Sequence, residues 1–513
     1  MADPTSGGPQ PSAAPEPGLT VERKGLKRGI LLGVIIAVIA LAGIGLLLFL
    51  GYNIGLSTLG IGLAAAILPV PVLVFCFLWL DRYEPEPVRY LAIAFGWGAA
   101  VATSVALVVN TQASNAFERA GLPDDLVAVL VAPVIEETMK FLGPLLILLI
   151  WRREFSGITD GIVYCGLSAV GFAMVENILY LGDHAYRAEA DQYGTASGLQ
   201  ALIATFIARI LLSGFAHPLF TSISGIGLGI AARSVDRRVR WFAPIAGLLV
   251  AMILHGSWNL MSVLVKITGE LLVLLYGYIA VMVPIFLGML GFAIWLRSWE
   301  GRLTERKLPL YVRAGWLSPP EVAALATLGR RQSARRWARR VAGDAGARAM
   351  RDYQFAATQL ALLRDGIDRG LDRKPAQAAQ SASDERRLLT TISRARQVFT
   401  GRDPQAPPAV WDGRGYQIVF PDGVRRPLAA PAEPVVPIPV ALPAGPPGYR
   451  PAPGYQLPPG GAPRYGPPPG YQSGYGGPPP GYQPGYGPPA GYGGPPPPGQ
   501  PGPGQPGPPD GYR

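Results

Sequence analysis

Apolar stretches long enough to cross a lipid bilayer recur along the first 300 or so residues, and they decide what this chain can fold into. A membrane-spanning helix needs about 20 predominantly apolar residues. Because lipid offers the backbone no hydrogen-bond partners, each such stretch is expected to be a helix. The eight stretches lie at about 29–50, 55–80, 90–110, 125–150, 158–181, 198–232, 241–265 and 270–297. The predicted fold is therefore all-α, a polytopic membrane bundle of about eight transmembrane helices.

Basic residues between these stretches predict how the bundle lies in the membrane. Arg and Lys cluster before the first stretch and follow the second, fourth, sixth and eighth, whereas connections 111–124 and 182–197 carry few basic residues and several acidic ones. Cytoplasmic loops carry the excess of Lys and Arg. All basic clusters fall on one side if 198–232 crosses once, so both termini are predicted to be cytoplasmic. The long stretch 198–232 is either one helix kinked at Pro218 or a re-entrant segment followed by a helix.

Composition divides the chain into four regions. Residues 1–22 are expected to form a disordered N-terminus, and residues 23–297 the transmembrane domain. Residues 298–400 are expected to form a basic, cytoplasmic, helical segment, since 298–398 hold 20 Lys and Arg against 10 Asp and Glu. Residues 401–513 are expected to be a disordered tail rich in Pro, Gly and Tyr. Near its start, 410–420 has an Asp-Gly turn that predicts a small hairpin.

Charged residues interrupt the fourth apolar stretch. Glu136, Glu137 and Lys140 lie near its middle. An ionisable residue near the bilayer centre costs at least about 2.5–3.5 kcal/mol and usually marks a functional site. Glu136 and Lys140 are four residues apart, so they share a helix face and can pair. A buried structural salt bridge would also explain this pair.

Other polar side chains are predicted to lie at a similar depth. The fifth, sixth and seventh stretches contribute Glu176 with Asn177, Arg209 with His217, and His255 with Asn259. The helical rise places most of these groups between the middle of the membrane and its outer face. They can therefore meet in one polar cavity, although a single intramembrane histidine is often only a hydrogen-bond partner between helices.

Two histidines and one glutamate are a ligand set of catalytic zinc that leaves a position open for water. A separate carboxylate near that water would act as general base. A metal-free site is equally open, in which a buried glutamate activates water while His and Asn donate hydrogen bonds to the developing oxyanion. Either arrangement can hydrolyse an amide.

The motifs EExxK, FxxxEN, a histidine before a Gly-rich helix, and HxxxN, in this order, resemble the PrsW family of intramembrane proteases. This family is grouped with the CAAX prenyl protease and Abi superfamily. Asp81-Arg-Tyr-Glu-Pro-Glu-Pro87 also resembles a loop of the family, and the resemblance covers about residues 55–297. It implies a transmembrane protease-like domain at 23–297. It also implies cleavage of a membrane-anchored protein, such as an anti-sigma factor, near its extracytoplasmic side.

The resemblance implies a role for each matching residue. It makes Glu136 or Glu137 the general base and Asn259 the group that steadies the oxyanion. The metal, expected to be zinc, would be bound by Glu176, His217 and His255. Two departures from the wider superfamily bear on that metal: lysine replaces arginine in the first motif, and glutamate replaces histidine in the second.

Two rival functions use the same residues differently. An ion- or proton-coupled transporter would use the carboxylates as a relay, although the two halves of the membrane region show no convincing repeat. A non-catalytic membrane scaffold would present the C-terminal tail to a partner. The basic segment is expected to contact anionic lipid headgroups, and no nucleic-acid partner is expected, because no recognisable module is present. Preference for Arg over Lys suggests a GC-rich bacterial genome and hence a bacterial cell membrane.

Overall fold

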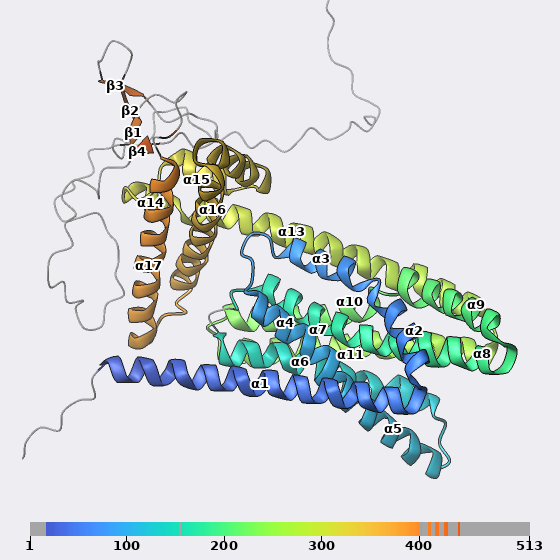
Figure 1. Ribbon diagram of the computed structural model, residues 1–513. Coiled ribbons are helices and arrows are strands. Elements are labelled where there is room, and N and C mark those ends of the chain that lie inside the picture. The colour runs from blue at the N-terminus through green and yellow to red at the C-terminus, as the bar shows by residue number, and fades with distance from the viewer. Residues whose placement is uncertain are drawn as a thin grey trace, which may run out of the picture. The chain divides into compact units, whose positions relative to one another are not determined.

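The computed structural model describes residues 17–152, 155–400, 402, 409–411, 416–419, 425–428 and 440–441, and it is almost entirely helical (Figure 1). The predicted all-α class is confirmed. Two segments were predicted to be disordered, 1–22 and 401–513. Residues 1–16 of the first and most of the second lie outside the described residues.

The membrane region is built from helices whose boundaries follow the predicted apolar stretches. Among the described residues, seven helical stretches are long and apolar enough to cross a membrane. The fourth predicted stretch, 125–150, is also helical but is not among these seven, and it carries Glu136, Glu137 and Lys140. Several helices contain π-helical turns, labelled η. The elements are α1 (Pro17–Ile54), α2 (Leu56–Ile67), α3 (Val70–Leu80), α4 (Val88–Gly96), η1 (Trp97–Ala102), α5 (Thr103–Arg119), η2 (Val127–Val131), α6 (Ala132–Ile150), α7 (Ile158–Ile178), η4 (Leu179–Arg187), α8 (Ala188–Tyr193), α9 (Thr195–Phe206), η5 (Ile207–Leu212), α10 (Ala216–Arg233), α11 (Arg237–Thr268), α12 (Leu271–Gly277), η6 (Tyr278–Met282) and α13 (Val283–Lys307).

Helix α7 is the most buried element of this region and packs against α4, α6 and α10. Glycines permit its close contact with α10. A Cβ on Gly225 would lie 2.1 Å from the carbonyl oxygen of Gly161, and one on Gly229 would lie 2.3 Å from Cα of Ile158. The Gly-rich stretch that begins at Gly225 therefore serves close helix packing. This contact brings the start of α10 beside the end of α7, where the candidate site lies.

The long sixth stretch is broken into two helices. η5 ends at Leu212, and α10 begins at Ala216 after a turn of three residues. Of the two predicted arrangements of this stretch, a single helix kinked at Pro218 is not observed, because Pro218 lies in the first turn of α10. Proline is tolerated there because a first-turn N–H has no partner within the helix. The break places His217 at the N-terminal end of α10.

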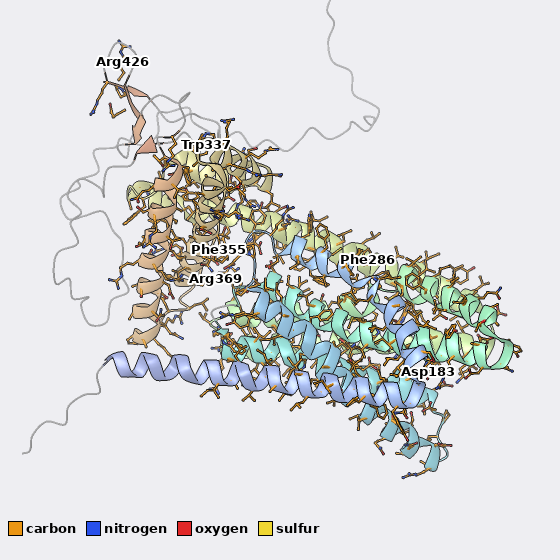
Figure 2. The ribbon with its side chains drawn as sticks, viewed as in Figure 1. Asp183, Phe286, Trp337, Phe355, Arg369 and Arg426 are labelled. Carbon is orange, nitrogen blue, oxygen red and sulfur yellow. The ribbon has the colours of Figure 1, made fainter. Side chains whose placement is uncertain are left out.

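A C-terminal helical region follows the membrane helices. It consists of α14 (Pro309–Arg313), α15 (Pro319–Leu325), α16 (Leu328–Asp368) and α17 (Pro375–Phe399), and the predicted boundary at 297/298 lies inside α13. Its own apolar core includes Trp337, which is labelled in Figure 2. The Trp337 ring lies 5.7 Å from that of Phe399. Helix α15 begins with a capping box in which the backbone N–H of Ser318 donates to Glu321 Oε2 at 2.8 Å.

Polar contacts tie this region to the membrane helices. Arg233 at the end of α10 pairs with Asp365 of α16. Arg331 Nη1 donates to the carbonyl oxygen of Tyr83 at 3.2 Å, and the Tyr83 hydroxyl donates to the carbonyl oxygen of Ala326 at 3.4 Å. The loop after α3 is therefore held by the C-terminal helical region.

A small sheet lies within the predicted tail. Its strands are β1 (Ala409–Trp411), β2 (Tyr416–Val419), β3 (Arg425–Leu428) and β4 (Val440–Ala441), in the order β3-β2-β1-β4. β1 and β2 are antiparallel, with Trp411 opposite Tyr416, which confirms the predicted hairpin. The Asp-Gly turn itself lies outside the described residues.

Candidate active site

Helix α6 buries three charged side chains in the membrane region. Lys140 Nζ lies 2.6 Å from Glu137 Oε1 and 3.5 Å from Glu136 Oε2. The ammonium group also lies 4.4 Å from the centre of the Phe172 ring. Buried charges are tolerated when they are paired and hydrogen-bonded. Here one cation serves two carboxylates, so the cluster needs further donors.

Those donors converge on Glu137, which is fully buried. Its Oε1 accepts a hydrogen bond from Lys140 and lies 2.9 Å from Nδ1 of His255 on α11. Its Oε2 accepts a hydrogen bond from the hydroxyl of Thr221 on α10 at 2.7 Å. Both oxygens are therefore engaged, and Glu137 links three helices.

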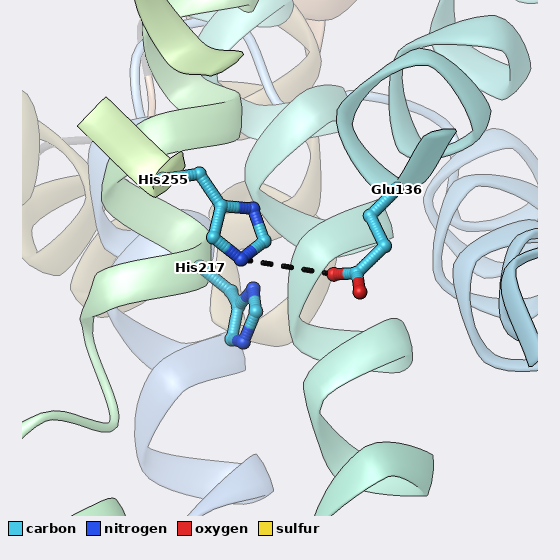
Figure 3. Close-up of side chains that lie close together, drawn as sticks. All are labelled: Glu136, His217 and His255. Atoms are coloured by element: carbon cyan, nitrogen blue, oxygen red, sulfur yellow. Dashed lines mark ion pairs between the residues drawn. The ribbon is translucent and has the colours of Figure 1, made fainter. Parts of the chain in front are cut away.

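Glu136 is less constrained. Its Oε1 accepts a hydrogen bond from Asn110 Nδ2 on α5 at 3.3 Å. Its Oε2 is buried without a hydrogen-bond partner among the described residues, 3.8 Å from His255 Nε2 (Figure 3). A buried carboxylate oxygen without a donor is costly. This oxygen is therefore the one available to water, a metal or a substrate.

The two histidines lie against each other. Their ring centres are 4.9 Å apart at an interplanar angle of 88°. His217 Nε2 lies 2.9 Å from Glu176 Oε2, and its Nδ1 lies 3.1 Å from Lys140 Nζ. Each imidazole is therefore oriented by a carboxylate, His217 by Glu176 and His255 by Glu137.

Glu176 in turn is paired with Arg209. Arg209 Nη2 lies 2.9 Å from Glu176 Oε2, and its Nε donates to Asn177 Oδ1 at 3.3 Å. The guanidinium carbon lies 3.5 Å from the centre of the Tyr180 ring. Arg209 is thus a partner of the FxxxEN motif, and it compensates the charge of Glu176.

One group of three residues has the spacing expected around a metal ion. Ligand atoms of Glu136, His217 and His255 all lie within 4.8 Å of one another. Zinc accepts such a donor set. The sequence pattern proposed Glu176 as the carboxylate ligand, but Glu176 bonds to His217 and Arg209, and Glu136 stands beside the histidines.

Asn259 makes a different contact. It lies one helical turn after His255 on α11, and its Nδ2 donates to the carbonyl oxygen of Ala128 at 2.8 Å. Ala128 belongs to the π-helical turn η2, where the regular helical hydrogen-bond pattern is altered. In this structure Asn259 joins α11 to the start of the α6 span.

Asn110 and Thr221 were missed by the sequence analysis. Each donates to one of the two motif glutamates. Both are uncharged polar residues, and neither belongs to one of the sequence motifs described above. Thr221 lies four residues after His217, so the two residues share a helix face. This spacing was the one feature of the sequence that could have indicated Thr221 as a site residue.

A second group of buried carboxylates lies near the loop after α3. Oxygens of Asp81, Glu86 and Asp160 lie within 4.8 Å of one another. Asp81 Oδ2 accepts a hydrogen bond from the Glu86 N–H at 2.7 Å, and Glu86 Oε2 accepts one from the Tyr164 hydroxyl at 2.6 Å. Burial raises the pKa of Asp81 to about 9 and that of Glu86 to about 12. At neutral pH these shifts favour the uncharged form of both carboxyl groups, which the hydrogen bonds from the Glu86 N–H and the Tyr164 hydroxyl hold in place.

Comparisons with known proteins agree with the motif order. Residues 86–289 match the model of the PrsW family of intramembrane metalloproteases. Protease PrsW of Bacillus subtilis (strain 168) is 32% identical over 143 residues, which are 28% of this chain and 56% of that protein. Protease PrsW of Geobacillus kaustophilus (strain HTA426) is 37% identical over 106 residues, 21% of this chain and 39% of that protein.

The predicted resemblance to the PrsW family is thus confirmed over the membrane region. The aligned segments span 56% and 39% of the two curated relatives. No solved structure matches the chain significantly. Together with the apolar helices, the family match identifies the chain as an integral membrane protein.

Proposed function

We propose that this protein is an intramembrane endopeptidase whose reaction centre is formed by Glu136, His217 and His255. The observation that carries the proposal is the buried Oε2 of Glu136, which accepts no hydrogen bond from the described residues and lies beside both imidazoles and 3.5 Å from the Lys140 ammonium. Hydrolysis of a peptide bond needs a carboxylate or metal that activates water and donors that stabilise an oxyanion. The family match over residues 86–289 supports this reaction.

The surrounding residues position these three groups. Glu137, held by Lys140 and Thr221, orients the His255 ring through Nδ1. Glu176, held by Arg209, orients the His217 ring through Nε2. Such partners fix the orientation of an imidazole and which of its nitrogens carries the proton. The Lys140 ammonium group also offers a positive charge where an oxyanion develops.

The donor types of this centre suit a zinc ion, which would take the place where the Lys140 ammonium now contacts His217 Nδ1 and Glu136 Oε2. Glu136, His217 and His255 would hold it, because they supply the donor set of catalytic zinc and leave one buried carboxylate oxygen free to bind. When bound, zinc lowers the pKa of its water and polarises the scissile carbonyl. The carboxylate partners of both imidazoles resemble those that support zinc-binding histidines in other proteins. Glu176 acts in this scheme through His217.

A metal-free reaction at the same residues is supported by Lys140. Its Nζ lies 3.1 Å from His217 Nδ1 and 3.5 Å from Glu136 Oε2, so a cation already stands between two of the three candidate ligands. In this variant Glu136 accepts the proton of the attacking water, and Lys140 and the imidazoles stabilise the oxyanion. The metal content of the purified protein distinguishes the two schemes.

The proposed substrate is a membrane-anchored protein cleaved near the extracytoplasmic face, with both termini of the protease in the cytoplasm. The basic segments after α3, α6, α10 and α13 support this orientation. Resemblance to the PrsW family supports an anti-sigma factor as the substrate class. The site residues come from helices, so the substrate segment must reach them within the membrane region.

The test uses the full-length protein in proteoliposomes with single-span reporter proteins. Mass spectrometry should detect two fragments with one cleavage site near the extracytoplasmic end of the span. Metal analysis of the same preparation should show about one zinc per chain, lost in His217→Ala and His255→Ala. Zinc-free protein that cleaves the reporter would establish the glutamate-dependent scheme. Proton flux without cleavage would instead support a transporter, and loss of function only on truncation after residue 400 would support a scaffold.

A further inference from the structure

A basic groove lies at a sharp fold in α16. The helix breaks at Ala342 and Gly343, and Gly343 has a φ of 61°. The two halves fold back on each other, since Gln354 Nε2 donates to the carbonyl oxygen of Arg331 at 2.8 Å. A Cβ on Gly346 would lie 2.2 Å from the carbonyl oxygen of Ala338, so the halves nearly touch near the break.

The groove between the halves has a cavity volume of about 380 Å³. Its residues recur three or four positions apart on each half, so each wall is one helix face. The first wall consists of Gln332, Arg335, Arg336 and Arg339, and the second of Asp344, Ala347, Arg348 and Arg351. Five arginines therefore face a space that contains a single carboxylate.

The positive charge of the groove is largely uncompensated. Asp344 pairs with Arg339 at 3.1 Å. Arg348 and Arg351 are exposed and make no ion pair within the described part of the chain. Arginines on neighbouring helix turns repel each other. An anion that bridges them would relieve this repulsion.

One arginine of the groove is held in place. Arg335 Nε donates to Gln354 Oε1 at 2.7 Å, and that glutamine also bonds to the backbone of the first half. Burial, followed by the nearby charges of Arg82 and Arg351, lowers the pKa of Arg335. Arg82 lies two residues after Leu56–Leu80, the stretch formed by α2 and α3 that is long and apolar enough to cross a membrane. Arg331, one helical turn before Arg335, donates to the carbonyl oxygen of Tyr83 at 3.2 Å, so this part of α16 lies beside the end of that stretch, at the level expected for lipid headgroups.

A second cavity of about 370 Å³ makes a useful contrast. It is lined by Arg233 and Arg369, among others. Both arginines contact Asp365, Arg233 directly and Arg369 at 2.8 Å. Its cations are thus neutralised by protein, whereas those of the α16 groove are not.

We propose that the α16 groove binds a phosphate-bearing anion, clamped between Arg335 on one wall and Arg348 and Arg351 on the other. Planar guanidinium groups bind phosphate oxygens in pairs, and several from two walls can surround one phosphate group. A membrane lipid headgroup and a soluble phosphate compound share this chemistry. The sequence predicted that the basic segment 298–400 contacts anionic lipid headgroups, and the proposal assigns anion binding to one groove of that segment. It does not depend on the proposed protease activity.

The test is calorimetric titration of the full-length protein in a non-ionic detergent. The probes are inorganic pyrophosphate, dioctanoyl phosphatidic acid and, as the neutral-headgroup control, dioctanoyl phosphatidylcholine. We expect one site for a phosphate probe, weakened at least about tenfold in Arg348→Gln/Arg351→Gln. The matched control, Arg386→Gln/Arg394→Gln, removes the same charge from exposed positions of α17 and should bind like wild type.

Each result has a defined meaning. Binding of pyrophosphate identifies a soluble ligand, and binding of phosphatidic acid alone identifies a lipid headgroup. Either result supports the proposal if Arg348→Gln/Arg351→Gln no longer binds that probe. Absence of binding by either probe, equal binding by the groove variant, or equal weakening in the control overturns the proposal. If the groove variant has a lower melting temperature, Arg336→Gln/Arg339→Gln provides a second pair on the opposite wall.

Discussion

Glu137 Oε1 and His255 Nδ1 lie 2.9 Å apart, although their residues are 118 positions apart in the sequence. This contact joins α6 to α11 in the interior of the membrane region. The same carboxylate also accepts hydrogen bonds from Lys140 and Thr221. Glu137 therefore supports the fold as well as the site, and this sets it apart from Glu136.

The first prediction concerns the stability supplied by Glu137. Glu137→Ala should lower the free energy of unfolding by about 3–5 kcal/mol, because it leaves the Lys140 ammonium buried without its nearest partner. Thermal melting in detergent measures the effect. Glu118→Ala, at an exposed position of α5, is the control and should melt like wild type. Equal melting of Glu137→Ala and wild type would show that Lys140 is neutral or solvated.

The second prediction concerns Arg209. Arg209→Gln removes the charge that holds Glu176, so His217 loses its oriented partner. Reporter cleavage should fall about 10- to 100-fold in kcat with little change in KM, as is typical when a partner of a catalytic imidazole is lost. Arg119→Gln, at an exposed position ending α5, should cleave normally. A kcat unchanged in Arg209→Gln would remove Arg209 from the positioning role.

The third prediction tests the close contact of α7 and α10. Gly225→Ala places a Cβ 2.1 Å from the carbonyl oxygen of Gly161, and the helices must separate. The expected loss of stability is about 1–3 kcal/mol. Gly288→Ala is the matched control, since nothing lies within 4 Å of its Cβ. If both variants melt at the same temperature, the contact between α7 and α10 is looser than the structure indicates.

Much of the site could be predicted from sequence because charged residues are rare in membrane helices. Glu136, Lys140, His217 and His255 stood out against apolar surroundings, and the structure brings them together. Which glutamate has a free oxygen could not be predicted. That depends on Thr221, which donates to Glu137 from a helix 84 positions further along the chain.

The parts of the fold that sequence missed depend on tertiary contacts. The fold-back of α16 requires a break at Ala342 and Gly343, within an otherwise continuous helical pattern. Asp160 joins Asp81 and Glu86 only because α7 packs beside the loop after α3. Local spacing predicts the helices and their apolar character, but it does not predict which remote side chains meet.

The fourth prediction is a pH dependence of stability. Burial raises the pKa of Asp81 to about 9 in the folded protein, from the ordinary aspartate value of about 3.9. The folded state therefore holds a proton that the unfolded state releases, and this stabilisation is complete below about pH 4 and is lost as pH rises to about 9. The melting temperature of wild type should fall between about pH 5 and 9.

Asp81→Asn provides the matched comparison for this pH effect. The amide oxygen can still accept the hydrogen bond from the Glu86 N–H, and the side chain no longer titrates. Its melting temperature should fall less steeply with pH than that of wild type. Parallel pH profiles for the two proteins would show that Asp81 is ionised in the folded state.

The most direct measurement is reporter cleavage by Glu136→Gln in proteoliposomes, with Glu118→Gln as the matched control. Gln keeps the shape of the side chain and the acceptor for Asn110, but it cannot take a proton from water or bind a metal as a carboxylate. The account predicts that Glu136→Gln inserts and melts like wild type and produces no fragments, while Glu118→Gln cleaves normally. Cleavage by Glu136→Gln at the wild-type rate would contradict it.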